Sequence, residues 1–109
     1  MLLERSEIMI REGAEDGFRA IMRERGLGML SSVPGVLEVN FGQGVENPLK
    51  FLLTVEWASM DAHTAFTGMP VFAEFRSLFG PYSVSGAMEH FMMDQARSPR
   101  ANRRCDSSA

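Results

Sequence analysis

Cysteine is nearly missing from this sequence, and its scarcity excludes two kinds of small scaffold. The 109-residue chain has one cysteine, Cys105, near its C-terminal end. A single thiol cannot form a disulfide within the chain, and no metal-ligand spacing surrounds it. Disulfide frameworks and cysteine-based zinc scaffolds are therefore excluded. The cytoplasm is the expected compartment, because disulfides belong to oxidising ones.

Long apolar runs are absent as well. The first residues show no apolar stretch of signal-peptide length behind a basic start. No segment approaches the roughly 20 consecutive apolar residues of a membrane-spanning helix. We therefore expect no membrane partner.

Basic residues are scarce outside the C-terminal segment. Up to Gln95 the chain has 7 basic and 13 acidic residues, which gives this part a net charge of −6 against −3 for the whole chain. A nucleic-acid-binding domain needs a basic face that releases counterions from phosphates. We therefore expect no nucleic-acid partner.

The composition is that of one small globular domain with regular secondary structure. Alternating apolar residues predict strands over residues 2–11, 36–42, 50–57 and 84–93. Apolar residues three or four positions apart predict helices over residues 15–30 and 60–79. Glycines weaken both helices: Gly26 and Gly28 favour a kink in the first, and Gly68 breaks the second.

The predicted order is β-α-β-β-α-β, which is typical of the ferredoxin-like fold. This α+β architecture has a four-stranded antiparallel sheet with both helices on one face. We assign residues 1–95 to the domain. Residues 96–109, rich in Arg and Ser, are expected to be disordered because they have too few apolar side chains to offset the entropy of ordering.

The strand sequences predict a homodimer. Phe51 and Trp57 point to one face of the third strand and Leu52 to the other, while Phe91 and Met92 point to opposite faces of the last strand. The helices of one subunit can cover only one face of the sheet. A contiguous apolar patch on the second face is rare in soluble monomers. Isologous pairing of two sheets is the simplest way to cover such a face.

Several segments resemble the antibiotic biosynthesis monooxygenase family. Residues 53–57, Leu-Thr-Val-Glu-Trp, followed by Ser59, Asp61, Ala62 and His63, are similar to its Leu-Val-Glu-Trp…Ala-His segment. The stretches 8–18, 66–76 and 89–91 resemble it too, so the resemblance spans about residues 3–93. It implies a dimeric α+β barrel whose pocket lies between the sheet and the helices of each subunit. Its enzymatic members are cofactor-free oxygenases of quinols and polycyclic aromatics, or haem degraders, and many members have no known activity.

Two positions depart from the haem-degrading branch. Where that branch has an Asn on the first strand, the nearest residue here is Ser6, and Arg76 falls at or next to the position of its haem-ligating His. Haem degradation is therefore not expected, and no cofactor is predicted. The aromatic oxygenases use a scattered set of Asn, Trp, Tyr and Arg, and residues of these types are present here as Asn40, Trp57, Tyr82 and Arg76.

The candidate catalytic residues are the two histidines, His63 and His90. If both reach the pocket, one can act as a base on a phenol near neutral pH. Otherwise His63 is a helix-surface or capping residue and His90 is packed in the sheet. A metal site formed by the two histidines and a Glu has no supporting spacing, so no metal is predicted.

Aromatic and charged side chains complete the candidate site. A flat ligand can stack on the predicted substrate-binding aromatics Trp57, Phe66, Phe72 and Phe75, although aromatics at this spacing are more often core residues. Arg76 either binds a ligand carboxylate or enolate, or pairs with Glu74. Glu56 and Glu89 are either buried proton acceptors or partners of Arg5, Arg11 or Lys50.

Two functions remain open from the sequence. The first is a cofactor-independent monooxygenase acting on a quinol or an aromatic small molecule. The second is a non-catalytic dimeric protein whose pocket binds a hydrophobic or aromatic small molecule.

Overall fold

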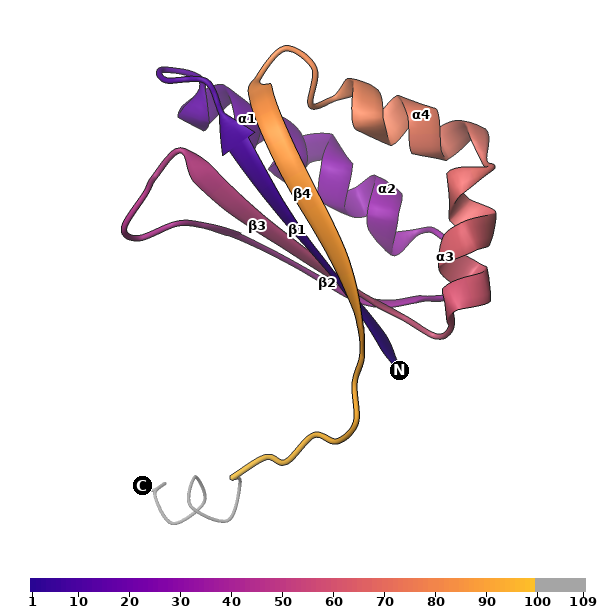
Figure 1. Ribbon diagram of the computed structural model, residues 1–109. Helices are drawn as coiled ribbons and strands as arrows, with labels where there is room; N and C mark the ends of the chain where they lie inside the picture. Colours follow the sequence, from indigo (N-terminus) through magenta and orange to yellow (C-terminus); the bar gives the residue numbers. More distant parts are fainter. Residues whose placement is uncertain (100–109) are drawn as a thin grey trace.

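The computed structural model describes residues 1–99, and most of the predicted tail, residues 96–109, lies outside the described residues. The elements follow the predicted order and are β1 (Leu2–Ile10), α1 (Glu15–Ile21), the π-helical segment η1 (Met22–Gly26), α2 (Leu27–Ser31), β2 (Val36–Gln43), β3 (Lys50–Trp57), α3 (Met60–Thr67), α4 (Pro70–Ser77) and β4 (Ser83–Met92). All strand pairs are antiparallel, in the order β2-β3-β1-β4. The helices lie on one face of this sheet (Figure 1). The predicted α+β, ferredoxin-like class is confirmed.

The predicted kink in the first helix takes the form of a π-helical segment. Between α1 and α2 the chain widens over Met22–Gly26 and then returns to α-helical geometry. A β-carbon at Gly26 would lie 2.6 Å from Met22 Sδ, a side chain that is completely buried. Glycine at this position therefore lets the buried methionine pack against the helix backbone.

The core lies between the helices and one face of the sheet. Every second residue of β1 and β3 is buried, which is the alternation expected of strands covered on one side. Phe18 is completely buried and makes edge contacts with Phe51, Phe41 and Phe79, with ring centroids 5.0, 5.9 and 5.7 Å away. These aromatic contacts fix the helices over the sheet.

The helix-free face of the sheet carries charge as well as apolar groups. Arg5 forms ion pairs with Glu7 and with Glu89, and Lys50 lies 3.8 Å from Glu7. Leu52 and Phe91 have the same orientation and remain 39% and 43% exposed. The face is therefore mixed: Arg5, Lys50, Glu7 and Glu89 form ion pairs within the chain, whereas Glu56 lies opposite another acid, Glu38.

The edge strand β4 is exposed on its helix side as well. Met88 and Met92 lie opposite Ser6 and Leu2 of β1 and so have the orientation of the core, yet they are 53% and 70% exposed. The helices do not extend far enough to cover this strand (Figure 1). Apolar exposure, expected on the helix-free face alone, is thus found at both faces of β4. Within residues 1–99, no helix is long and apolar enough to span a membrane.

Candidate active site

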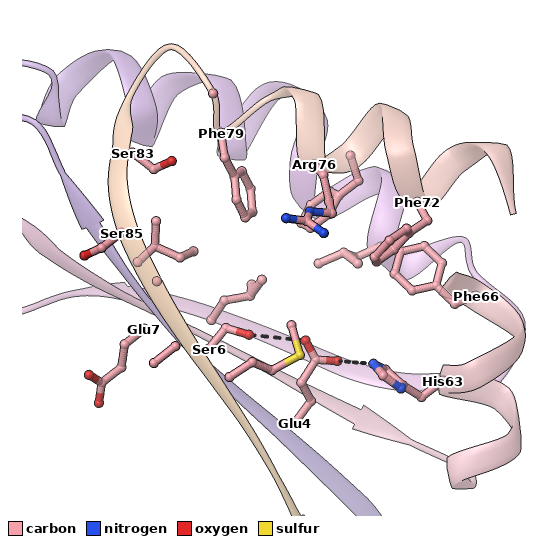
Figure 2. Close-up of a pocket in the computed structure, with 18 of the residues that line it drawn as sticks. Glu4, Ser6, Glu7, His63, Phe66, Phe72, Arg76, Phe79, Ser83 and Ser85 are labelled. Carbon is pink, nitrogen blue, oxygen red and sulfur yellow. Dashed lines mark hydrogen bonds and ion pairs between the residues drawn. The ribbon is translucent and has the colours of Figure 1, made fainter. Parts of the chain in front are cut away.

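A cavity of about 510 Å³ lies between β1 and β4 on one side and α3 and α4 on the other. Four phenylalanines form much of its wall: Phe66, Phe72, Phe75 and Phe79. Its polar residues include Glu4, Ser6, His63 and Arg76 (Figure 2). An aromatic wall with a few polar groups is typical of a site that binds a small organic molecule.

Glu4 is a buried carboxylate at one end of this cavity. The alternation of β1 places its side chain on the core side, between Leu2 and Ser6, where it is 7% exposed. Trp57 Nε1 donates a hydrogen bond to Oε1 at 2.9 Å, and Ser6 Oγ donates to Oε2 at 3.2 Å. Each carboxylate oxygen thus has one donor, and these bonds fix the orientation of the group.

His63 lies beside this carboxylate on α3. Ser59 caps the helix by accepting a hydrogen bond from the Ala62 backbone N–H at 3.1 Å, so the first turn brings His63 over the end of the sheet. The residue is 9% exposed, and the Trp57 ring packs against its imidazole at 5.3 Å between centroids. Its Nε2 lies 3.6 Å from Glu4 Oε1.

His90 extends this pair into a cluster of three groups. On β4 it lies directly opposite Glu4, and its Nε2 is 3.3 Å from Nε2 of His63. The two nitrogens share one hydrogen bond, so one of them donates and the other accepts. His63 Nδ1 is buried and has no hydrogen-bond partner among the described residues. The two predicted catalytic histidines are therefore in contact, but only His63 lines the cavity, and His90 lies behind it as its hydrogen-bond partner.

Burial lowers the pKa of His63 below its ordinary value of 6.5. The Glu4 carboxylate raises this pKa by a smaller amount, and His90 lowers it further. Desolvation has the largest effect because the charged imidazolium loses its hydration in the protein. His63 is therefore neutral near pH 7 and able to accept a proton.

Arg76 lies across the cavity from this cluster. It extends from α4 on the side opposite Glu4 and Ser6, and its guanidinium carbon lies 5.7 Å from the centroid of the Phe72 ring (Figure 2). The alternative partner Glu74 pairs instead with Arg25, at 3.2 Å. No carboxylate within residues 1–99 forms an ion pair with Arg76. The arginine thus presents an unpaired positive charge beside the cavity.

Three of the residues predicted to bind substrate do not line the cavity. Trp57 is completely buried behind Glu4 and acts on it as a hydrogen-bond donor. Tyr82 packs beside Phe18, with ring centroids 6.1 Å apart. Asn40 pairs with Thr54 on the helix-free face, where it donates a hydrogen bond to Glu38. We therefore leave Asn40 and Tyr82 out of the candidate site.

Glu4 is the site residue that sequence reasoning missed. Attention went to Glu56 and Glu89, both of which lie on the helix-free face, where Glu89 pairs with Arg5 as one of the open alternatives predicted. The alternation of residues along β1 could have identified Glu4. It shares the even-numbered positions of β1 with Ile8 and Ile10, which are core positions.

Comparison with known proteins gives a family match and one curated relative. A family model described as antibiotic biosynthesis monooxygenase matches residues 1–78, a stretch that contains Glu4, His63 and Arg76 and ends before β4. YczJ of Bacillus subtilis (strain 168), a protein of uncharacterised function, is 29% identical over 93 residues. That alignment covers 84% of this chain and 97% of YczJ.

Solved structures share the fold at lower sequence identity. A candidate antibiotic biosynthesis monooxygenase from Bordetella bronchiseptica has a TM-score of 0.77 at 23% identity, and the match covers 86% of this chain and 97% of that one. SnoaB of Streptomyces nogalater, a cofactor-independent oxygenase, has a TM-score of 0.76 at 15% identity, with 87% and 94% covered. At these identities the matches establish a shared fold.

Proposed function

The chain belongs to the antibiotic biosynthesis monooxygenase family, and on this basis we propose that it is a cofactor-independent monooxygenase of a quinol or a polycyclic aromatic molecule. The observation that carries the proposal is the pairing of Glu4 with His63 at one end of an aromatic-lined cavity, with His90 in contact with His63 and Arg76 on the other side. SnoaB, which shares the fold, is a cofactor-independent oxygenase.

The histidine cluster supplies the proton acceptor. A hydroxyaromatic substrate gives a proton to neutral His63, and Glu4, 3.6 Å away, stabilises the imidazolium that forms. His90 shares the resulting N–H through its contact with His63. Within this buried cluster the attraction between imidazolium and carboxylate is stronger than it would be in water.

Arg76 and the phenylalanines bind the substrate anion. Phe66 and Phe72 offer ring surfaces to a flat molecule, and the unpaired Arg76 stabilises the negative charge on its oxygen. The activated carbon of the anion then reduces O₂. For a methylene group, one oxygen atom stays on the carbon as a carbonyl, and the other leaves with the two hydrogens as water.

Oxygen consumption tests this proposal. Untagged protein in the presence of a chelator is incubated with hydroquinones and anthrones, and the products are checked for incorporation of ¹⁸O₂. We expect uptake by the unchanged chain and its loss in the double variant His63→Ala, His90→Ala. Glu89→Gln is the matched control, since Glu89 neighbours His90 in sequence but lies on the other face of the sheet.

Two results would reject the enzyme. One is no uptake with any substrate, and the other is uptake that both histidine changes leave intact. Tight binding of an aromatic molecule without oxygen uptake would instead identify a non-catalytic binding protein.

We also propose that the chain forms a homodimer through the helix-free face of its sheet. Leu52 and Phe91 are exposed on this face, and Arg5 is paired with Glu7 and Glu89 within the chain, so a second copy can cover these groups without leaving that arginine unpaired. A two-fold arrangement lets the same patch serve on both subunits.

A further inference from the structure

Three side chains from three elements bring possible metal ligands together. Glu4 of β1, His63 of α3 and His90 of β4 each offer one ligand atom, and these atoms lie within 4.8 Å of one another. We propose that the three residues bind one divalent transition-metal ion, such as Zn²⁺, with an open coordination position toward the cavity. This inference goes beyond the proposed function, which uses no metal.

Two of the three distances within the cluster already suit a shared ion, and the third requires a side-chain movement. The Nε2 atoms of the two histidines are 3.3 Å apart. An ion about 2.05 Å from each would form an N–metal–N angle of about 107°, close to the tetrahedral value. The 3.6 Å between His63 Nε2 and Glu4 Oε1 corresponds to about 120° at normal bond lengths. In a tetrahedral site two such ligand atoms are about 3.4 Å apart, so Glu4 and His90, whose ligand atoms lie within 4.8 Å of each other, would approach by up to about 1.4 Å on binding.

The surroundings of Glu4 resemble the second shell of a metal site. Trp57 and Ser6 hold its carboxylate by one hydrogen bond on each oxygen. Such bonds orient a ligating carboxylate and reduce the entropy lost when the ion binds. His63 Nδ1, in contrast, has no partner among the described residues, and we therefore expect moderate rather than very tight affinity.

The donor set selects a class of ion. Two imidazoles and one carboxylate are the protein ligands of many catalytic zinc sites, which leave a further position for water or substrate. The absence of thiolate from the cluster disfavours Cu(I), and the imidazoles disfavour Mg²⁺ and Ca²⁺. The open position would face the cavity, because Glu4 and His63 both line it.

Metal binding would interfere with the proposed oxygenase. The ion takes the lone pair of His63 Nε2, the ring nitrogen beside Glu4 and His90, and the imidazole can then no longer accept the substrate proton at that atom. A chain loaded with Zn²⁺ should therefore lose oxygen uptake and recover it when a chelator is added. This consequence rests on the proposed function, whereas metal binding itself does not.

Titration with metal tests the site directly. The protein is the full chain without a histidine tag, in a Cys105→Ser background so that the thiol cannot contribute a ligand. Isothermal titration with Zn²⁺ gives stoichiometry and affinity, and Co²⁺ reports coordination through its visible d–d absorption. The variants are His90→Gln, whose side chain is only partly buried, and Glu4→Gln. The control is Glu89→Gln, and circular dichroism confirms the fold of each protein.

We expect one Zn²⁺ per chain, Co²⁺ bands of four- or five-coordinate geometry, and a loss of at least about tenfold in affinity in both ligand variants. Glu89→Gln should bind as the unchanged chain does. No saturable binding, or equal affinity in His90→Gln and the control, would overturn the metal site. Because oxygen uptake is measured in chelator, failure of one proposal leaves the other standing.

Discussion

The buried carboxylate of Glu4 links the stability of the protein to its site. It lies within the core layer, and its charge is compensated by hydrogen bonds rather than by an arginine or a lysine. A buried acceptor that loses its donor retains the cost of desolvation. The residues that hold Glu4 are therefore expected to matter for folding as well as for function.

Trp57→Phe tests this link. The change removes the indole N–H, leaves Glu4 Oε1 without its 2.9 Å donor and reduces the volume of a completely buried ring. We expect the free energy of unfolding in urea to fall by about 1–3 kcal/mol or more. In a Glu4→Gln background the same change should cost less, because the uncharged amide loses less with its donor. Equal costs in both backgrounds would contradict a hydrogen bond of this importance.

The lowered pKa of His63 predicts a loss of stability in weak acid. In the unfolded chain His63 takes up a proton near pH 6.5, whereas the folded chain does so only at lower pH. Below about pH 6.5 the unfolded state therefore binds more protons, and the free energy of unfolding decreases as the pH falls toward the lowered pKa. Glu4 and His90 are the titratable groups that face His63.

Urea unfolding of metal-free protein between about pH 7.5 and pH 5.5 measures this effect. Other groups also titrate, so the comparison is with His63→Gln, in which the decline should be shallower. Parallel curves for the two proteins would show that His63 does not contribute.

Arg76→Gln is expected to reduce turnover more than substrate affinity. The proposed role of its charge is to stabilise the substrate anion, which is more fully developed in the transition state than in the bound substrate. Loss of a preorganised donor of this kind lowers kcat by about 10²–10³ in buried sites, and we expect a smaller loss of at least about tenfold here because Arg76 is exposed. Arg76→Lys should restore part of it. A change confined to KM would contradict this role.

At the scale of elements, periodicity was sufficient to predict the fold. Alternating apolar residues, as in β1 and β3, predicted the strands, and apolar residues three or four positions apart predicted the helices, with breaks at Gly26 and Gly68. One-sided burial produces these periodic patterns directly in the sequence. The site was harder to predict. The meeting of His63 with Glu4 and His90 depends on strand register and on how α3 crosses the end of the sheet, and neither is a local property.

Strand register also explains why Asn40, predicted to bind substrate, does not line the cavity. Asn40 has a side-chain type suited to the pocket, but its position in β2 opposite Thr54 puts it on the helix-free face. A shift of one position along the strand would have put it on the core side. Residue type alone could not decide between the two faces.

Gly35 positions the helix that carries His63, and Gly35→Ala tests this. Its φ is +91°, and a β-carbon there would lie 2.5 Å from Cβ of Ala62 on α3. We expect a loss of about 1–3 kcal/mol in the free energy of unfolding, because backbone strain and the steric clash act together. Chemical shifts of His63 should change as well, since α3 must move.

Gly28→Ala is the matched control for this prediction. Gly28 lies in α2, and a β-carbon there meets no atom within 4 Å. Alanine favours the helix by up to about 1 kcal/mol, so the same substitution should stabilise the protein here. Destabilisation of similar size at both positions would contradict the geometric explanation.

At the scale of the whole molecule, the sheet has more apolar surface than its own helices cover. The uncovered groups lie on both sides of β4, with Phe91 on the helix-free face and Met88 and Met92 at the edge. Arg5 on the helix-free face is already paired with Glu7 and Glu89 within the chain, whereas Glu56 lies opposite Glu38 without a basic partner among the described residues. Covering the apolar part of this face gains burial, and the electrostatic cost is smallest where Glu56 stays at the rim in water.

Leu52→Glu is expected to dissociate the proposed dimer. Light scattering should give about twice the 12.1 kDa chain mass for the unchanged protein. Leu52 is 39% exposed in one chain, and a carboxylate there would be buried without a partner if two faces met. Val45→Glu is the control, because Val45 lies outside the strands and is 88% exposed. If the unchanged protein has the mass of one chain, or if Leu52→Glu remains a dimer, the proposed interface is wrong. The exposure of Leu52 and Phe91 then needs another explanation.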